Sequence, residues 1–407
     1  MHPRIVASLA IALIAAPAAA QLGLPGVRDT LGRVKGTVDG LVESTASTTR
    51  QTVNELTTAR LDRLTRLVRD NRQAIEFDAE AQPARRGELL LEGAAPAALA
   101  RAEQAGFAVI GRENLEDLGL SVVRLAVPPG ATLAQAERRL RKVLPDVTIS
   151  ADQLYFASQS AAVAASGLPS VPSLAPSVRV GVIDGAPGPS IPVATIQGFA
   201  RGAPQASNHG SAVVSLLRQA GANDVALADV YGSDPAGGNA LAIVRALGWL
   251  LNRKVRVVSI SLVGPRNPVL ARAIAAVQAR GVVIVAAVGN DGPAAPPSYP
   301  ASYPGVLAVT AVDGRNRALI EAGRALHLDY AAPGAGMLAA NAAGQWKPVR
   351  GTSFATPLVA ARTARAMAER GAQWRAALDS EAVDLGRQGH DPVFGRGLIC
   401  GSCRRTK

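Results

Sequence analysis

The sequence is poor in cysteine, histidine and aromatic residues, and each shortage excludes a class of structure or chemistry. Its 407 residues include two Cys, at positions 400 and 403, too few for a disulfide scaffold or, by themselves, a zinc site. Only 3% of the residues are aromatic, so Ala, Val and Leu must build the core. Four His leave few candidates for chemistry that needs imidazole near neutral pH. The 48% of hydrophobic residues nevertheless exclude a disordered chain.

Residues 1–20 have the pattern of a signal peptide. Arg4 precedes an apolar run from Ile5 to Ala16, and small residues follow up to Gln21. We therefore expect cleavage before Gln21 and a protein that is secreted or periplasmic. The alternative is a membrane anchor, but the run is too short to span about 30 Å of hydrocarbon comfortably. We expect no transmembrane anchor.

Residues 21–86 predict an amphipathic helical prefix, because apolar residues recur at alternating spacings of four and three. The prefix could pack on its own protein, or it could bind a partner or a surface. Nothing in it suggests chemistry. The apolar positions are Val27, Leu31, Val34, Val38 and Leu41, then Leu61, Leu64 and Val68.

Residues 87–158 predict a small α+β domain with the order β-α-β-β-α-β, a ferredoxin-like split βαβ unit. Such a unit has a core too small to be more than marginally stable alone. The expected elements are Glu88–Leu91, Ala108–Ile110, Val122–Val127 and Val147–Tyr155 as strands, with Pro96–Gly106 and Leu133–Leu144 as helices.

A stretch rich in Ala, Ser, Pro and Gly, residues 159–177, predicts a linker with good access for proteases. Beyond it, residues 178–400 alternate β runs with helical segments, which predicts an α/β domain. We expect a doubly wound parallel sheet with helices on both faces.

We expect residues 401–407 to form a basic tail. Cys400 and Cys403 are expected to form a small local disulfide or to stay free thiols.

Three residues of this α/β domain have side chains suited to nucleophilic catalysis. Asp184 ends the first predicted strand, at the sheet edge where open α/β folds place their sites. His209 lies in a small-residue turn before an amphipathic helix, and Ser353 lies before a helix of small residues. Each could be a capping or turn residue. Together they supply the nucleophile, the base and the orienting carboxylate of a catalytic triad.

The motifs around these residues resemble those of the subtilisin-like serine proteases, the subtilases. Gly351–Pro357, Gly-Thr-Ser-Phe-Ala-Thr-Pro, matches the family's nucleophile motif over seven residues. His209–Val213 is similar to its histidine motif, with Ser where Thr is usual. Val182–Gly185 is similar to its aspartate motif, although the family usually has Thr or Ser between Asp and Gly. The chain order Asp, His, Ser is also that of subtilisin.

The resemblance implies roles for further residues. Asn290 would donate to the oxyanion of the tetrahedral intermediate, together with the Ser353 amide. The strand edge at Ser261, Leu262 and Val263 would pair with the substrate backbone, and Gly289 would help to wall the first specificity pocket. The family usually has Gly at the position of Val263, so we expect a narrower pocket edge. The 87–158 domain is similar to the propeptide that blocks the cleft of many subtilases before it is removed.

We therefore predict an exported serine endopeptidase, made as an autoprocessed zymogen and acting on proteins or peptides. The alternatives are a processing protease dedicated to one partner and a non-catalytic binding protein on the same fold. We expect no required cofactor; calcium is possible, but no acidic cluster has convincing ligand spacing. Almost all of the net charge of +12 lies after residue 165. For an exported protease this favours acidic substrates or a cell surface rather than nucleic acid.

Overall fold

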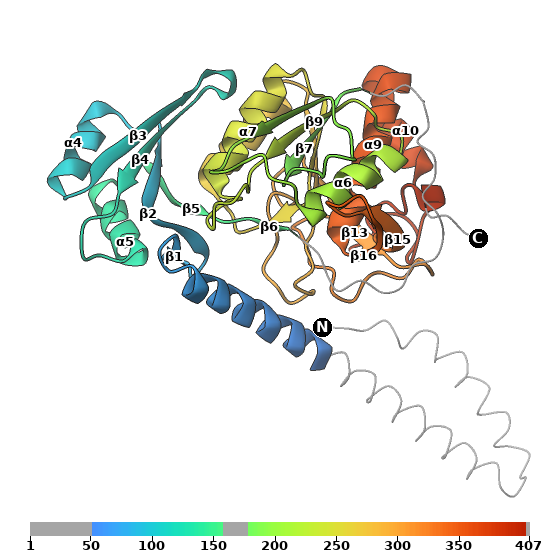
Figure 1. Ribbon diagram of the computed structural model, residues 1–407, viewed down its shortest axis with the longest axis horizontal. Coiled ribbons are helices and arrows are strands. Elements are labelled where there is room, and N and C mark those ends of the chain that lie inside the picture. Colours follow the sequence, from blue (N-terminus) through green and yellow to red (C-terminus); the bar gives the residue numbers. More distant parts are fainter. Residues whose placement is uncertain (1–50, 158–177, 404–407) are drawn as a thin grey trace, which may run out of the picture. The chain divides into compact units, whose positions relative to one another are not determined.

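The computed structural model describes residues 51–157 and 178–403 (Figure 1). The predicted signal peptide 1–20, the predicted linker 159–177 and residues 404–407 of the predicted tail lie outside this part of the chain. Contacts divide the chain into residues 1–56 and 57–407. Of the first unit, the structure describes only residues 51–56, all helical; the sheets belong to the second unit. None of the described helices combines the length and the apolar character needed to cross a bilayer.

Residues 21–50 of the predicted prefix lie outside the described part of the chain, and residues 51–86 are helical only at their start. Residues 51–70 are helical, but two strands follow them, β1 (Ile75–Phe77) and β2 (Pro83–Glu92). The prediction of a helical prefix over 21–86 is therefore wrong for its last part, and the small domain begins before residue 87. Pro-Ala-Arg-Arg at the start of β2 lacks the apolar run from which we predicted strands. It is held in the sheet by pairing with β1.

The small domain has the predicted β-α-β-β-α-β order, which is confirmed with the additional strand β1 in front. Its sheet is antiparallel, and the strand order is β1-β2-β4-β3. Strand β5 also pairs with β2, on the side away from β4. A capping box formed by Thr132 and Gln135 starts its second helix. The elements after β2 are α4 (Pro96–Gln104), β3 (Ala108–Leu115), η1 (Glu116–Leu118), β4 (Leu120–Ala126), α5 (Leu133–Val143) and β5 (Thr148–Gln153).

The two faces of this small sheet are covered by different parts of the chain. Leu89 and Leu91 of β2 point to one face, where they pack with residues of α4 and α5 such as Leu140. Leu90, between them, points to the other face and belongs to a cluster with Leu247 and Ile274 of the large domain. All six side chains are buried. The helices of the small domain therefore cover only one face of its sheet, and the large domain covers the other.

The large domain, residues 178–403, contains the predicted parallel sheet with helices on both faces, which is confirmed. The strand order is β14-β13-β12-β10-β7-β9-β8, and every neighbouring pair is parallel. Buried Val, Ile, Leu and Ala fill the strands, as expected for a sheet covered on both faces. The strands are β7 (Val180–Asp184), β8 (Thr195–Gly198), β9 (Val225–Asp229), β10 (Val257–Ile260), β12 (Val283–Ala287), β13 (Leu307–Val312) and β14 (Tyr330–Pro333).

Helices α6 and α9 pack on one face of the large sheet, and α7 and α8 on the other (Figure 1). The helices are α6 (Asn208–Gln219), α7 (Ala240–Asn252), α8 (Pro268–Ala279), α9 (Thr352–Arg370) and α10 (Trp374–Glu381), with η2 (Gly371–Gln373) between the last two.

Two short pairs of strands complete the fold. A hairpin of β15 (Ala335–Ala340) and β16 (Trp346–Arg350) precedes the Ser353 motif. Strand β6 (Phe156–Ala157) pairs antiparallel with β11 (Leu262–Val263), so the last described residues of the small domain lie against the large one. Near the C-terminus, Cys400 and Cys403 form a local disulfide across η3 (Gly401–Cys403).

Candidate active site

Asp184 and His209 come together at the carboxyl edge of the large sheet. Asp184 is the last residue of β7, and His209 is the second residue of α6; both side chains are buried. Each carboxylate oxygen of Asp184 lies 2.9 Å from Nδ1 of His209. An ionised carboxylate can only accept, so Nδ1 carries the ring proton and donates it. Nε2 is then left with a free lone pair, the form required of a general base.

The turn around Asp184 explains why Gly replaces the usual hydroxyl residue after it. The Gly185 amide donates to Asp184 Oδ1 at 2.8 Å, so the backbone supports the carboxylate. A Cβ at Gly185 would lie 2.5 Å from Oγ of Ser207, the N-cap residue of α6. Ser211, where Thr is usual, donates to the Ser207 carbonyl and accepts from the Gly188 amide. Both departures from the family motifs therefore fit the local packing.

Ser353 is the second residue of α9 and is fully buried. Its hydroxyl donates to the Ser261 carbonyl at 2.9 Å, and the Ser261 hydroxyl donates back to the Ser353 carbonyl at the same distance. The ring of the next residue, Phe354, packs on the His209 ring with centroids 5.6 Å apart. The structure thus brings the Ser353 segment onto His209, with the hydroxyl hydrogen-bonded to the strand edge rather than to the imidazole.

Asn290 lies beside this segment with its amide nitrogen unused. Its Oδ1 accepts from the Thr352 amide at 3.0 Å, which fixes the orientation of the side-chain amide. Nδ2 is buried and has no hydrogen-bond partner in the described part of the chain, and the same is true of His209 Nε2. Buried polar atoms are rarely left unpaired without a functional reason. Thr352, to which we gave no role from sequence, also accepts from the Gly289 amide through its hydroxyl.

The predicted substrate edge is occupied by the protein's own chain. In the β6–β11 pair, Ala157 lies opposite Leu262 and Phe156 opposite Val263. Val263 faces Gly289: a Cβ built on Gly289, whose φ is +90°, would lie 3.5 Å from the Val263 side chain and 3.0 Å from Oγ of Ser298. A larger residue than Gly would therefore fill the space beside this strand.

Tyr155 anchors the occupying segment between two parts of the large domain. Its side chain is fully buried over Gly264, where an added Cβ would lie 2.6 Å from the ring. Its hydroxyl donates to the Pro265 carbonyl and its amide to the Gly238 carbonyl, each at 2.8 Å. Burial raises the pKa of Tyr155 well above its usual value. No sequence pattern indicated this contact.

Asp152 forms a second polar contact across the same boundary. Its Oδ1 accepts from the Leu241 amide, in the first turn of α7, at 2.9 Å, and Arg85 lies 3.7 Å away. Burial raises the pKa of Asp152 to about 6, although the Leu241 amide and Arg85 act in the opposite direction. The carboxyl group is therefore poised to change charge within the range of mildly acidic pH.

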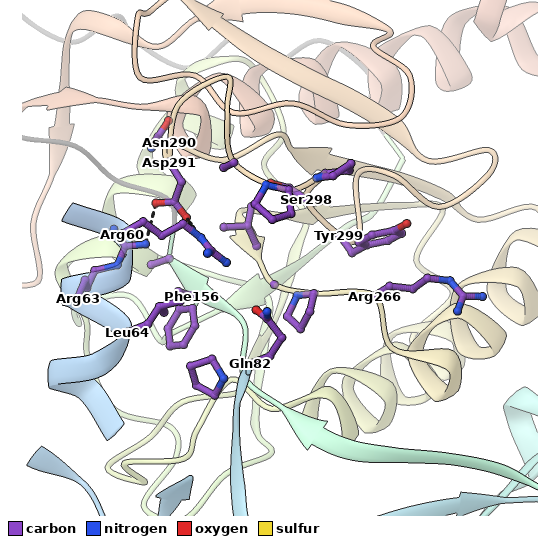
Figure 2. Close-up of a pocket in the computed structure, with 18 residues that line it drawn as sticks. Arg60, Arg63, Leu64, Gln82, Phe156, Arg266, Asn290, Asp291, Ser298 and Tyr299 are labelled. Carbon is purple, nitrogen blue, oxygen red and sulfur yellow. Dashed lines mark hydrogen bonds and ion pairs between the residues drawn. The ribbon is translucent and has the colours of Figure 1, made fainter. Parts of the chain in front are cut away.

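A cavity of about 480 Å³ lies beside Asn290 and the substrate edge (Figure 2). The large domain contributes Val263 and Gly264 on one side and residues 295–299 on the other. The small domain and residues 57–70 close it with Phe156, Ala157, Arg60, Arg63 and Leu64, among others.

The other two histidines of the large domain, His327 and His390, lie outside the candidate active site. Nε2 of His327 lies 2.8 Å from the Val306 carbonyl oxygen, and Nε2 of His390 lies 2.7 Å from that of Leu328. An acidic group that we did not predict, Asp78, Glu80 and Glu137, has oxygens within 4.8 Å of one another. Backbone amides and the Gln153 side chain already donate to Asp78, and we assign no ion there. The expectation that no cofactor is required stays a prediction.

An Asp–His pair, a serine at a helix start and a free amide donor on a parallel α/β fold are typical of a serine hydrolase. A sequence profile of the Subtilase family, Peptidase_S8, matches residues 196–397, which include His209, Asn290 and Ser353. Subtilisin BL of Lederbergia lenta is 31% identical over 192 residues, which cover 46% of this chain and 69% of that protein. The chain belongs to the subtilase family.

Other relatives are matched over smaller parts of their length. Subtilisin E of Bacillus subtilis (strain 168) is 32% identical over 165 residues, 39% of this chain and 42% of that protein. The minor extracellular protease Epr of the same organism is 32% identical over 167 residues, 40% of this chain and 26% of that protein. The chain thus covers less than half the length of these two relatives.

A solved structure extends the likeness in fold beyond the profile. Fervidolysin from Fervidobacterium pennivorans, a keratinolytic enzyme related to subtilisin, superposes with a TM-score of 0.65. The superposition covers 81% of this chain and 63% of that one at 16% identity, so it bears on the fold alone.

Proposed function

We propose that the protein is an exported subtilisin-like serine endopeptidase, made as a zymogen that processes itself. The observation that carries this proposal is that two buried atoms without a hydrogen-bond partner among the described residues, the basic nitrogen His209 Nε2 and the amide donor Asn290 Nδ2, belong to side chains that contact the Ser353 segment. Acyl transfer needs a base for the nucleophile and a donor for the oxyanion, and these atoms supply both.

In the first half of the reaction, a rotation about the Ser353 side chain brings Oγ from the Ser261 carbonyl to His209 Nε2. Ser353 Oγ attacks the carbonyl carbon of the substrate, and its proton passes to Nε2. Asp184 keeps the imidazolium oriented. The oxyanion accepts from Asn290 Nδ2 and the Ser353 amide. His209 then gives the proton to the leaving amine, and the peptide bond breaks.

In the second half, water attacks the acyl-enzyme ester and gives a proton to His209. The same donors hold the second oxyanion, and the proton returns to Ser353 Oγ as the carboxylic acid leaves. All the groups used belong to the large domain. Substrates are proteins or peptides, because an extended chain pairs with β11 through its backbone whatever its side chains.

The zymogen proposal rests on what lies on the substrate edge. Strand β6 pairs with β11 in the way expected of a substrate, and Tyr155 holds it there. Substrates cannot pair with the edge while β6 occupies it, so the small domain acts as an intramolecular inhibitor. We place the processing site after Ala157, within the predicted linker region. Export is supported by the signal-peptide pattern and by the likeness to a protease described as extracellular.

A serine-directed phosphonate probe tests the enzyme activity on the secreted, processed protein. We expect labelling of the wild type and none of Ser353→Ala. Ser380→Ala, which alters an exposed serine on α10, is the matched control and should label as the wild type does. A processed and folded wild type that does not label would leave only the alternative of a binding protein. Labelling without digestion of unfolded casein would favour a protease dedicated to one partner.

A further inference from the structure

Basic side chains gather at the amino edge of the large sheet, at the opposite ends of the strands from the candidate active site. Parallel neighbours begin at the same edge, and β10 lies between β7 and β12. Helix α9 runs from Thr352 to Arg370. Met367 of α9 and Gly371 after it line the same hollow as Arg256, which directly precedes β10, so α9 ends at this edge. We call the cluster the basic edge, and it consists of Arg253, Lys254, Arg256, Arg280 and Arg370.

The cations of the basic edge have no acidic partners. All five residues are exposed, and none makes an ion pair within the described part of the chain. The carboxylates close to them in sequence are already paired. Asp224 Oδ1 lies 3.0 Å from Arg179 Nε, and Glu369 Oε1 lies 2.7 Å from Arg365 Nε. Like charges without counter-charges repel one another, so the basic edge attracts an anionic partner.

The hollow at the basic edge has a volume of about 710 Å³. Arg256 lines it together with Gly281 and Gly371, the residues that follow Arg280 and Arg370. Cations therefore lie around it. Several of its lining side chains are apolar and buried or half-buried: Val282, Val283, Leu307, Met367 and Trp374. A volume of this size is typical of pockets that hold small ligands, and it can take a few apolar side chains.

This combination does not fit a lipid bilayer or a nucleic acid. Membrane binding needs large apolar side chains that protrude, and none of the exposed large hydrophobic residues of the described chain lines the hollow. Nucleic-acid bases need an open aromatic ring on which to stack. Trp374 is the one aromatic residue lining the hollow in the described chain, and the Arg375 guanidinium already lies over its ring, 6.0 Å from the centroid.

The protein's own linker does not complement the site either. Residues 158–177 directly precede Val178, which lines the hollow, but they contain no Asp or Glu. A polypeptide with both acidic and apolar residues fits both features. Its apolar side chains enter the hollow, and its carboxylates reach the arginines around it. Guanidinium groups bind carboxylates through paired, charge-assisted hydrogen bonds.

We propose that the basic edge and its hollow bind an acidic polypeptide segment whose apolar side chains fill the hollow. The site lies at the ends of the strands opposite to Asp184, so a bound partner leaves the active site open. It holds the protease on an acidic protein. This partner goes beyond the proposed function, because binding at the basic edge uses none of the catalytic groups.

The test measures binding to the full-length Ser353→Ala chain, which keeps the basic edge and does not cut the probe. The probe is a fluorescein-labelled peptide rich in glutamate with leucine at intervals, and its anisotropy is followed as protein is added. A matched peptide with lysine in place of glutamate is the control. We expect the acidic peptide to bind and the basic peptide not to bind. Raising the salt concentration should weaken binding, because ions screen exposed charges.

Charge-reversal variants locate the binding site. Arg256→Glu combined with Arg280→Glu should weaken binding at least about tenfold, because each change removes an attraction and adds a repulsion. Arg201→Glu combined with Arg315→Glu is the matched control. These two exposed arginines follow β8 and β13 at the other edge of the sheet, so the net charge changes equally while the basic edge stays intact. This control should keep the affinity.

A change inside the hollow tests the apolar part of the proposal. Met367→Gln keeps the length of the side chain but makes the lining polar. It should weaken binding of the peptide that contains leucine and leave binding of poly-glutamate unchanged. An equal effect on both peptides, or no effect on either, would show that the hollow does not hold the apolar side chains.

The remaining outcomes decide whether the site and its partner are assigned correctly. Loss of binding in the Arg256/Arg280 variant but not in the Arg201/Arg315 variant supports the proposal. Equal binding by the two variants, or equal binding of the acidic and basic peptides, overturns it. Tighter binding of phosphatidylglycerol vesicles or single-stranded DNA than of the acidic peptide, lost in the Arg256/Arg280 variant, overturns the choice of a polypeptide. The proposed function stands or falls separately, on phosphonate labelling of the wild type.

Discussion

The small-domain sheet and the large-domain sheet differ in which parts of the chain cover their faces. The large sheet has its own helices on both faces, whereas the small sheet has α4 and α5 on one face and borrows α7 and α8 for the other. A sheet face left open exposes apolar surface to water, so the small domain gains much of its stability by docking. The large domain gains no catalytic group from the contact.

This difference separates the expected effects of mutations in the two domains. All residues of the proposed mechanism lie in the large domain, so changes there should lower kcat of the matured enzyme. Changes in the small domain should alter docking and inhibition and leave the kcat of the matured enzyme unaffected.

The largest effect is expected from removing the proposed oxyanion donor of the large domain. Asn290→Ala should lower kcat by about 10²–10³-fold with little change in KM, the loss that subtilisin itself shows when such a donor is removed. Steady-state kinetics on a peptide anilide measure it. Asn341→Ala, a turn residue whose Oδ1 caps local amides, is the control and should keep kcat. An unchanged kcat in Asn290→Ala would remove Asn290 from the site.

Leu90 lies on the face of the small sheet that α7 and α8 cover, so a substitution there should disrupt the packing between the two domains. In a full-length Ser353→Ala chain, Leu90→Ala should weaken docking by about 2–5 kcal/mol, the usual cost of such a cavity. Hydrogen exchange at the Leu241 amide, which donates to Asp152 across the boundary, should then become faster. Leu89→Ala, on the other face, should also speed exchange inside β2 and β4. Unchanged exchange at Leu241 in Leu90→Ala would show that the two domains do not share this core.

Docking should also depend on pH through Asp152. Burial raises its pKa to about 6 in the docked state, so docking takes up a proton. The contribution of this group is fully present below the usual Asp pKa of about 4 and is lost as pH rises through about 6. The dissociation constant of the processed small domain should rise by up to about 100-fold across this range, at about tenfold per pKa unit.

Asp152→Asn keeps the acceptor for the Leu241 amide but cannot titrate. It should flatten the profile between pH 4 and 7, as followed by size-exclusion chromatography of the processed complex. If the dissociation constant of the Asp152→Asn domain depends on pH as steeply as that of the wild type, another group causes the pH dependence.

The smallest effect is expected at the anchor of β6. Tyr155→Phe removes the hydroxyl that donates to the Pro265 carbonyl and keeps the ring over Gly264. Loss of one neutral hydrogen bond, about 0.5–1.5 kcal/mol, should weaken inhibition by the small domain roughly 2–10-fold. Inhibition assays with the processed small domain measure it, with the exposed Ile110→Ala as control. Equal inhibition by the Tyr155→Phe and wild-type domains would contradict the anchoring role.

The sequence was sufficient for the features that local motifs encode. The residues around Asp184, His209, Asn290 and Ser353 each form a short motif, and the alternation of β runs with helices predicted the parallel sheet. The run Leu89–Leu91 also indicates a strand buried on both faces, since alternate residues of a strand point to opposite sides.

What the sequence could not show depends on contacts between distant segments. The ion pair between Arg60 and Asp291 joins residues 231 positions apart, and neither residue has a local pattern that marks it. The β6–β11 pairing and the burial of Tyr155 likewise depend on how the two domains dock. The first residues of β2 are polar and basic, so no periodicity marked them as a strand.

The central claim, that Ser353 cuts its own chain to release the large domain, is tested by N-terminal sequencing of the secreted wild type and of Ser353→Ala. The account predicts that the wild type begins between residues 158 and 178 and that the variant keeps the residues of the small domain. The same processed N-terminus in both proteins would contradict it.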